Sequence, residues 1–555
     1  MSIVSLLDQF PLVTDAPQGI QTFRNLILRL AITGRLLPQQ ETDSPVAPDI
    51  ARVRIQRPAP VESLLATFDL PSTWEWALVG ELCTLRTGAT PSTARPEYYG
   101  GSIRWLVSGD IHKRNIRDCD GRISEVGLAH SNCKLLPENS VLIALNGQGK
   151  TRATVAILRV PAACNQSLVA MTPVSSEVLL SEFLYLNLLY RYYEIRDITG
   201  QKQRRGLNMG LVGDLPISVA PIAEQHRIVA KVDELMALCD RLEAQQADAA
   251  SAHATLVKTL LDTLTQSQSA ADFAAHWQRL AQHFETLFST EASIDALKQT
   301  LLQLAVMGKL VPQDPSDEPA SELLKRIQAE KAKLVAEGRI KKYKPLPEIG
   351  EDEKPFELPE GWEWARFPEL GFFGRGKSKH RPRNDPALFN PPIYPLVQTG
   401  EVARAGSIIN EYHSKYSELG LSQSRLWPQG TLCITIAANI ADSAILGFDA
   451  CFPDSVVGFI PSPAIGDARY FLAFMKTARE QLLRFAPSTA QKNINLEILE
   501  SVQIPLPPAN EIHRIVTKID ELMALCDQIA ARLKAARELA AHYATAATEA
   551  ALEAA

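Results

Sequence analysis

The sequence predicts an α+β protein with an internal pseudo-twofold repeat, in which a long antiparallel two-helix coiled coil separates two globular, mostly β lobes. Three observations lead to this prediction. The 555-residue chain repeats its own motifs in the same order, its repeated segments contain long amphipathic helices, and its variable segments carry short apolar runs typical of strands.

The repeat is clearest in two helical segments. Residues 221–242 read PIAEQHRIVAKVDELMALCDRL and residues 508–529 read PANEIHRIVTKIDELMALCDQI, an offset of 287 residues (508 minus 221). Upstream matches follow in order: RNLILRLAITGRLLPQ (24–39) with KQTLLQLAVMGKLVPQ (298–313), and LPSTWEWALVGEL (70–82) with LPEGWEWARFPEL (358–370). A single period of this length indicates a duplicated domain rather than a solenoid.

These matches divide the chain into alternating helical and globular segments. We expect an N-terminal helical segment (1–69), a first lobe (70–220), a central helical spacer (221–357), a second lobe (358–507) and a C-terminal helix (508–555). Within the lobes, the runs SVLIALNG (140–147) and TLCITIAAN (431–439) are typical of strands.

The two long helices each carry an apolar seam. The seam residues alternate at steps of four and three: Ile228, Val232, Leu235, Cys239 and Leu242 in one helix, and Ile515, Ile519, Leu522, Cys526 and Ile529 in the other. This is the a/d spacing of a coiled coil, although ordinary helix packing produces it too. Because the seam occurs twice in one chain, we expect the two helices to pair in antiparallel orientation.

Composition excludes several classes of protein. The chain is 46% hydrophobic and 22% charged, which is typical of a globular protein. It has no apolar run long enough for a membrane span, and its start, MSIVSLLDQF, lacks the basic region of a signal peptide. None of its 8 cysteines forms a C-x-x-C pair, so we expect neither a zinc site nor a disulfide framework. A cytoplasmic location is the simplest expectation.

Positive charge is concentrated in the two lobes. The net charge of the chain is -6, yet residues 70–220 hold 16 basic and 13 acidic residues, a balance of +3. Residues 358–505 hold 14 of each, which leaves -9 for the rest of the chain. DNA-binding proteins use cations to contact phosphates, so this distribution fits lobes that contact DNA.

The stretch GFFGRGKS (371–378) matches the G-x-x-x-x-G-K-[ST] pattern of nucleotide hydrolases. A working phosphate loop needs a buried strand before it and a helix after it. Here Pro368 interrupts the preceding residues and several prolines follow. In the repeat alignment Gly376 falls on Gly88, where Ala89 replaces Lys377. We therefore expect a tight glycine turn that is common to both copies, rather than an ATP site.

With these segments defined, the chain resembles a known family. The run TGATPSTARPEYYGGSIRWLVSGDI (87–111) resembles the opening of a target recognition domain in Type I restriction–modification specificity subunits. The long helices, together with KLVPQDPSDEPASELLKRIQAEKAKL (309–334), resemble the spacer regions of that family. The likeness covers nearly the whole chain. The second lobe departs from the pattern, because LVQTGEV (396–402) replaces LVSGDI (106–111).

The resemblance implies a subunit without catalysis of its own, which reads a bipartite, asymmetric DNA site with one half for each lobe. The implied partners are double-stranded DNA, two methyltransferase subunits docked on the helices, and restriction/translocase subunits. S-adenosylmethionine, ATP and Mg²⁺ would be bound by those partners and none by this chain. We accordingly expect no catalytic residue and no metal site here.

Candidate DNA-contacting residues follow from residue type and position, because cations suit phosphates while amides and guanidinium groups suit base edges. In the first lobe they are Thr87, Gly88, Thr90, Lys113, Arg114, Asn146, Gln148, Lys150, Arg152, Lys202, Arg204 and Arg205. In the second lobe they are Arg375, Lys377, Lys379, Arg381, Asn439, Gln491 and Lys492. A solvated surface loop would carry similar residues, so that alternative stays open for each of them.

Two other kinds of function fit parts of the sequence. A coiled-coil adaptor that does not read DNA would account for the helices. An enzyme would account for short motifs: the phosphate-loop pattern of an ATPase, or Asn390-Pro391-Pro392-Ile393, which approaches the loop of amino-group methyltransferases but has Ile393 at the aromatic position. Exchanging the first lobe distinguishes an adaptor, which would keep its target, from a DNA reader, which would change one half-site.

Overall fold

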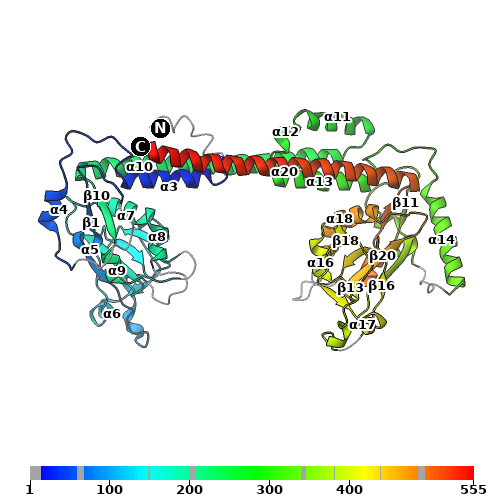
Figure 1. Cartoon of the computed structure of the whole chain (residues 1–555), viewed down its shortest axis with the longest axis horizontal. Coiled ribbons are helices and arrows are strands. Elements are labelled where there is room, and N and C mark those ends of the chain that lie inside the picture. The colour runs from blue at the N-terminus through cyan, green and yellow to red at the C-terminus, as the bar shows by residue number, and fades with distance from the viewer. Residues whose placement is uncertain are drawn as a thin grey trace. The chain divides into compact units, whose positions relative to one another are not determined.

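The computed structural model describes residues 14, 16–58, 68–147, 151–198, 207–338, 346–379, 382–437, 439–484 and 494–554. The chain forms two compact units, which Figure 1 shows with their elements labelled. Unit 1 comprises residues 1–249 and 535–555, and unit 2 comprises residues 250–534. Helices α10 (Ile222–Thr265) and α20 (Ala509–Ala554) contribute residues to both units. They begin directly after Pro221 and Pro508, as the sequence predicts.

The lobe of unit 1 is built on two sheets. The larger has the strand order β2-β9-β6-β7-β4: β2 (Cys83–Thr87), β9 (Leu168–Pro173), β6 (Val141–Ala144), β7 (Val155–Leu158) and β4 (Asn115–Ile116). Its pairs are antiparallel except β4–β7, which is parallel. The smaller sheet has the order β5-β3-β8: β5 (Arg122–Ile123), β3 (Tyr99–Leu106) and β8 (Ala163–Cys164). Strand β3 is antiparallel to β5 and parallel to β8.

The apolar run of strand β6 is buried on both of its faces. Val141 and Ile143 join the main core together with helices α3 (Gly19–Ile32) and α7 (Ser181–Tyr190). Leu142 and Ala144 join a second cluster, which also contains residues of β3 and β8. Side chains alternate between the faces of a strand, so each face of β6 has its own core. The strand predicted from SVLIALNG is therefore confirmed.

Unit 2 repeats this topology with different residues. Its larger sheet has the order β12-β20-β17-β18-β14: β12 (Gly371–Arg375), β20 (Val456–Pro461), β17 (Leu432–Thr435), β18 (Ser443–Leu446) and β14 (Ile408–Ile409). Its smaller sheet has the order β15-β13-β19-β16: β15 (Ser414–Tyr416), β13 (Tyr394–Leu396), β19 (Ala450–Cys451) and β16 (Leu426–Trp427). The parallel pairs also correspond, β14–β18 to β4–β7 and β13–β19 to β3–β8. The structure thus confirms a duplicated domain.

Each lobe begins and ends on a two-stranded ladder. In unit 1, β1 (Glu75–Leu78) pairs antiparallel with β10 (Pro216–Val219). In unit 2, β11 (Glu363–Ala365) pairs in the same way with β21 (Ile504–Leu506). The Trp-Glu-Trp motif of each copy leads into the first strand of its ladder, and the second strand leads into α10 or α20. Both ends of each lobe are therefore joined at the start of a long helix.

The seam of α10 packs inside unit 1. Ile228, Val232, Leu235 and Cys239 lie in the main core with α3, and Arg24 of α3 binds Asp240 at 2.5 Å and Glu243 at 3.1 Å. The short helix and the lobe of the same copy therefore pack on this part of α10, which the sequence did not predict.

The seam of α20 shows the same behaviour in unit 2. Its first residues, Ile515 and Ile519, lie in the lobe core. Further along, Cys526 clusters with helix α13 (Glu291–Val306), whose Lys298 binds Asp527 at 2.6 Å. The end of α10, including Leu261, joins this cluster, so the two long helices do pack together within unit 2.

The phosphate-loop pattern does not form a phosphate loop. Its first five residues, Gly371–Arg375, form β12, and no helix begins between Gly376 and Lys379. A Cβ on Gly376 would lie 2.3 Å from the Pro453 carbonyl oxygen, and one on Gly88 would lie 1.7 Å from the Cys164 carbonyl oxygen. Each glycine follows the first strand of a five-stranded sheet. The prediction of one glycine turn common to both copies is confirmed.

Candidate functional site

A buried hydrogen-bond network holds each lobe to its long helix. In unit 1 the Trp74 indole donates to Glu224 Oε2 at 2.9 Å, and the Gln39 amide donates to Glu224 Oε1 at 2.5 Å. Glu224 lies in the first turn of α10 and is fully buried. We call these three residues, and their counterparts in unit 2, the base network. It joins the N-terminal segment, the residue before the first strand of the lobe and the helix at one carboxylate.

Unit 2 has the same base network. The Trp362 indole donates to Glu511 Oε2 at 3.0 Å, and the Gln313 amide donates to Glu511 Oε1 at 3.3 Å. Burial raises the pKa of Glu511, although the hydrogen bonds from Trp362 and Gln313 favour the charged form. Burial raises the pKa of Glu224 in the same way. A carboxylate is costly to bury unless donors satisfy it, so each network depends on its Trp and Gln.

We expect Glu511→Gln to change the pH dependence of unfolding. Because burial raises the pKa of Glu511, its contribution to stability is largest when the carboxyl is protonated, and it is lost as pH rises from 4.5 through the raised pKa. An amide does not titrate, so the unfolding free energy of the variant, relative to the natural chain, should rise over that window. Urea titrations from pH 4.5 to neutral pH measure this difference. Exposed Glu521→Gln is the control, and parallel profiles for Glu511→Gln and the natural chain would contradict the expectation.

Beside each base network, an ion pair ties the helix to the preceding segment. Arg227 binds Asp43 at 2.6 Å in unit 1, and Arg514 binds Asp317 at 2.7 Å in unit 2. The Arg514 guanidinium holds the pKa of the Asp317 carboxyl below its usual range. Both aspartates are nearly buried, so these pairs are more than surface contacts.

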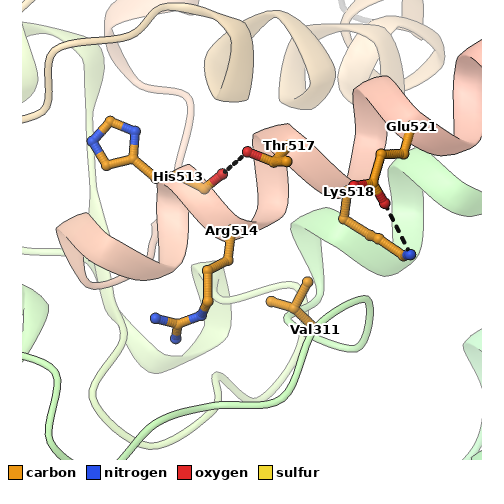
Figure 2. Close-up of a pocket in the computed structure, with 6 residues that line it drawn as sticks. All are labelled: Val311, His513, Arg514, Thr517, Lys518 and Glu521. Atoms are coloured by element: carbon orange, nitrogen blue, oxygen red, sulfur yellow. Dashed lines mark hydrogen bonds and ion pairs between the residues drawn. The ribbon is translucent and has the colours of Figure 1, made fainter.

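The start of α20 presents a polar face to solvent, which Figure 2 shows. His513, Arg514, Thr517, Lys518 and Glu521 line a shallow pocket of about 340 Å³ together with Val311. Lys518 donates to Glu521 at 3.1 Å, and Thr517 donates to the His513 carbonyl oxygen at 2.8 Å. The pocket is shallow and open rather than enclosed, so it fits a contact surface better than an active site.

The same face recurs on α10. Its residues are His226, Arg227, Lys231 and Glu234, and Lys231 donates to Glu234 at 2.9 Å. Lys231 and Lys518 have side chains 37% and 45% exposed, so burial in the core does not account for their recurrence. We call the two surfaces the repeated helix faces. One chain thus presents the same exposed side chains twice.

In unit 1, three predicted DNA-contacting residues form a single turn. Thr87 and Thr90 are exposed, and Thr90 donates to the Gln166 amide oxygen at 2.8 Å. Between them, Gly88 packs closely on the Cys164 carbonyl. The Trp105 indole of β3 donates to the Ala89 carbonyl oxygen at 3.0 Å and so ties the turn to the smaller sheet. Lys113 and Asn146 lie on other loops of the lobe and are also exposed.

Two predicted arginines of unit 1 are engaged within the protein. Arg114 forms an ion pair with Asp233 of α10, and its guanidinium lies 5.4 Å from the centre of the Tyr185 ring. Arg152 donates to the Arg196 carbonyl oxygen at 3.2 Å, and Arg196 donates back to the Arg152 carbonyl oxygen at 2.8 Å. Both are half-buried, so these contacts give them a structural role in the lobe.

In unit 2, the predicted residues around Gly376 are exposed. Arg375 donates to the Asp454 carbonyl oxygen, while Lys377 and Lys379 lie on the turn after β12. Asn439 is exposed after β17, the strand equivalent to β6, which precedes Asn146. The structure therefore places the two asparagines after equivalent strands. The remaining predicted residues lie outside the described residues: Gln148, Lys150, Lys202, Arg204, Arg205, Arg381, Gln491 and Lys492.

Sequence reasoning missed two groups of residues. It gave no role to the repeated Glu224 and Glu511, although a carboxylate that recurs in an apolar setting was a usable signal. It also passed over Arg104, Asp118 and Arg122, which meet because strand pairing brings Arg104 beside the loop that carries Asp118. Within the described part of the chain, no group of three His, Cys, Asp or Glu side chains could hold a metal ion. Nor is any described helix long and apolar enough to cross a membrane.

Comparison with known proteins decides the family. The model of the Type I restriction modification DNA specificity domain matches this chain twice, over residues 71–250 and 359–537. The chain belongs to this family. It is a DNA specificity subunit of the Type I restriction–modification class, the non-catalytic component of such a system. Each match starts just before the tryptophan of a base network and ends within a long helix, so it covers one lobe and one repeated helix face.

Individual relatives are similar to this chain along nearly its whole length. The Type I restriction enzyme EcoEI specificity subunit of Escherichia coli is 34% identical, over 96% of this chain and 94% of its own length. The EcoAI specificity subunit of the same organism is 32% identical over the same shares. A chain of a solved type I R-M system, described for its complex assembly and conformational transition, has a TM-score of 0.53 and 17% identity. That alignment covers 87% of this chain and 99% of the other, so the two share a fold.

Proposed function

We propose that this specificity subunit directs its complex to a bipartite, asymmetric DNA site, with the unit 1 lobe contacting one half and the unit 2 lobe contacting the other. The observation that carries the proposal is that the larger sheet has the same strand order in both units but is followed by unlike loops. After the first strand of the larger sheet, unit 1 presents Thr87–Thr90 and unit 2 presents Gly376–Lys379. A common scaffold with different side chains at the same place suits two different half-sites.

The exposed cations support contact with the phosphate backbone. Lys113 in unit 1 and Arg375, Lys377 and Lys379 in unit 2 are exposed on loops of the lobes. Neutralising phosphates releases counterions, so DNA binding should weaken as salt rises. We also propose that the lobe residues outside the described part of the chain, including Arg204, Arg205 and Lys492, contribute to the same contact.

We propose that the repeated helix faces dock two copies of one methyltransferase subunit. Two copies of one surface on one chain suit two identical partners, and each face combines exposed cations with a carboxylate that can pair across an interface. In this proposal S-adenosylmethionine is bound by the methyltransferase subunits, and ATP and Mg²⁺ are bound by restriction/translocase subunits that join the complex in the cytoplasm. This chain then supplies no cofactor site.

Exchanging one lobe tests the proposal. We expect that replacing residues 70–220 with the first lobe of a relative will change one half of the methylated site and leave the other half unchanged, because each lobe lies with its own stretch of long helix in a separate unit. Sequencing of methylated bases in random DNA, treated with the chain and its methyltransferase subunits, reads out the result. Exchanging 358–507 is the matched control and should change the other half. An unchanged site after both exchanges would favour the adaptor, and a contiguous palindrome would contradict a bipartite site.

A further inference from the structure

Two arginines face each other across neighbouring strands in the unit 1 lobe. Arg104 on β3 pairs directly with Arg122 on β5. Like charges at directly opposite positions of an antiparallel pair destabilise the sheet, so this arrangement needs a compensating group. Asp118, in the loop before β5, supplies it: the Arg104 Nε donates to Asp118 Oδ1 at 2.9 Å, and an Arg122 terminal nitrogen donates to the same oxygen at 2.8 Å.

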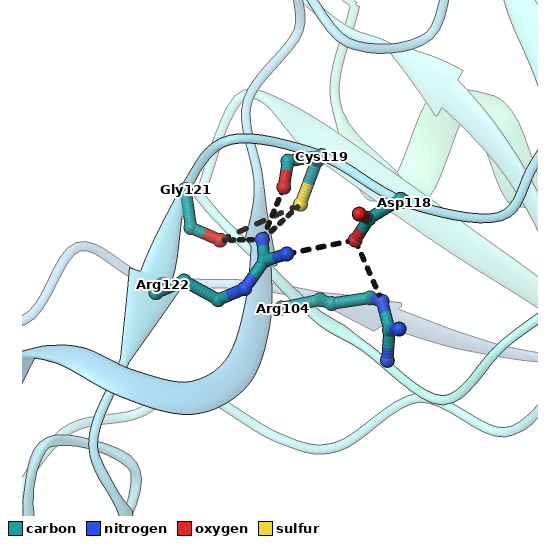
Figure 3. Close-up of polar contacts among 5 residues, drawn as sticks. All are labelled: Arg104, Asp118, Cys119, Gly121 and Arg122. Carbon is teal, nitrogen blue, oxygen red and sulfur yellow. Dashed lines mark hydrogen bonds and ion pairs between the residues drawn. The ribbon is translucent and has the colours of Figure 1, made fainter.

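The two arginines use their hydrogen-bond donors differently, as Figure 3 shows. Arg122 turns back on its own loop, where one terminal nitrogen donates to the carbonyl oxygens of Cys119 and Gly121, the latter at 2.9 Å. Arg104 contacts the carboxylate through Nε, and its two terminal nitrogens point away from Asp118. Among the described residues, those two nitrogens have no hydrogen-bond partner, and the side chain is 36% exposed.

The carboxylate that orients Arg104 is itself fixed in place. The Trp105 backbone N–H donates to the Gly121 carbonyl oxygen at 3.0 Å, and a Cβ on Gly121 would lie 2.2 Å from the Trp105 carbonyl oxygen. The loop that carries Asp118 is thus held tightly against β3. The hydrogen bond from Arg104 also lowers the pKa of Asp118, so the carboxylate is charged at neutral pH.

We infer that Arg104 reads a guanine in the half-site contacted by unit 1, with Asp118 as the residue that positions it; this inference rests on the proposed DNA-reading function. A guanidinium held at Nε presents its two terminal N–H groups side by side, which matches the O6 and N7 acceptors of guanine in the major groove. A phosphate would accept from the same two N–H groups but carries no sequence information, so a base contact affects one position of the recognised site, whereas a phosphate contact affects methylation at all sites.

The arrangement belongs to unit 1 alone among the described strand pairs. In unit 2, Leu396 of β13 pairs with β19 as Leu106 of β3 pairs with β8, so Tyr394 stands in the place of Arg104. Tyr394 pairs with Tyr416 of β15, without an arginine on either strand. Two lobes with one strand order therefore differ at the point where Arg104 stands. Two lobes that recognise different half-sites need different side chains at equivalent positions.

Methylation of a random DNA library by the full complex, followed by sequencing, tests the inference. We expect Arg104→Ala, and Arg104→Lys as a milder change, to relax the preference for guanine at one position by roughly 5- to 150-fold, the range expected for one bidentate base contact. Asp118→Ala should relax the same position to a smaller extent and no other position. The half-site of unit 2 is the internal control, and Arg95→Ala removes a more exposed cation of the same lobe without this pattern.

Each other result overturns the inference. A uniform fall in methylation at all sites would make Arg104 a phosphate contact, and an unchanged motif would leave it without a role in recognition. A natural unit 1 half-site without guanine, once lobe exchange has identified that half, would also contradict it. Failure of the proposed function looks different, because the natural chain would then yield no bipartite motif at all.

Discussion

Replacing Trp362 with alanine should lower the unfolding free energy of unit 2 by roughly 3–5 kcal/mol, the range for truncating a buried tryptophan. Trp362 is 5% exposed in the lobe core, so its loss leaves a cavity. Its indole is also the closer of two donors to the buried Glu511 carboxylate, at 3.0 Å against 3.3 Å for Gln313. Removing it leaves a buried charge with one long hydrogen bond, which adds to the cost of the cavity.

Hydrogen exchange read by mass spectrometry, together with urea unfolding, measures this effect. Protection should fall across residues 358–507 and stay unchanged across residues 70–220. Trp364→Ala is the matched control, because Trp364 is half-buried and its ring packs edge-on against Phe356 at 5.2 Å. The importance of the base network would be refuted if the two variants lost similar stability. Trp74→Ala should produce the corresponding loss in unit 1.

Reversing one charge on a repeated helix face should remove one partner from the assembly. We expect Lys518→Glu or Lys231→Glu to reduce the number of bound methyltransferase subunits from two to one, and the double variant to bind none. Each reversal places a second carboxylate beside Glu521 or Glu234, which now pair with these lysines at 3.1 Å and 2.9 Å. Like charges at an interface cost several kcal/mol, which is on the order of 100-fold or more in affinity.

Native mass spectrometry of chain mixed with methyltransferase subunits counts the bound copies. Arg532→Glu, a reversal of the same sign on α20 outside the face, is the control and should leave two copies bound. Melting curves of the free chains should coincide, because Lys518 and Lys231 are exposed. Two copies retained by the double variant would exclude these faces as docking sites.

The sequence predicted the features that repeat. Motifs that recur at a fixed offset located both lobes and both long helices, and the proline before each helix located its start. The glycine turn was also predictable, because the second copy has Gly88 without the lysine of a phosphate loop. The seams were predicted correctly as helical and apolar, and the two long helices do pack together. What a/d spacing does not reveal is that α3 and α13 also pack on these seams.

The candidate site was less predictable, because local sequence patterns do not show which residues on different strands and helices come into contact. Arg114 was expected to contact a phosphate because of its charge and position, yet the fold places it on Asp233 of α10. Arg104 and Asp118 were passed over because only the β3–β5 register brings them together. Burial of Glu224 and Glu511 likewise depends on the lobe that closes over them.

The base network also bears on how such a gene acquires new targets. Its two sockets, Glu224 with Gln39 and Glu511 with Gln313, are built from matching residues outside the lobes, and an incoming lobe supplies one indole on the residue before its first strand. Recombination that replaces everything from that tryptophan to the helix therefore brings in a whole lobe, while the Glu and Gln of the base network stay in place. Because the sockets match, a lobe from either half of the gene fits the other, and a few ancestral lobes can be shuffled into many pairings.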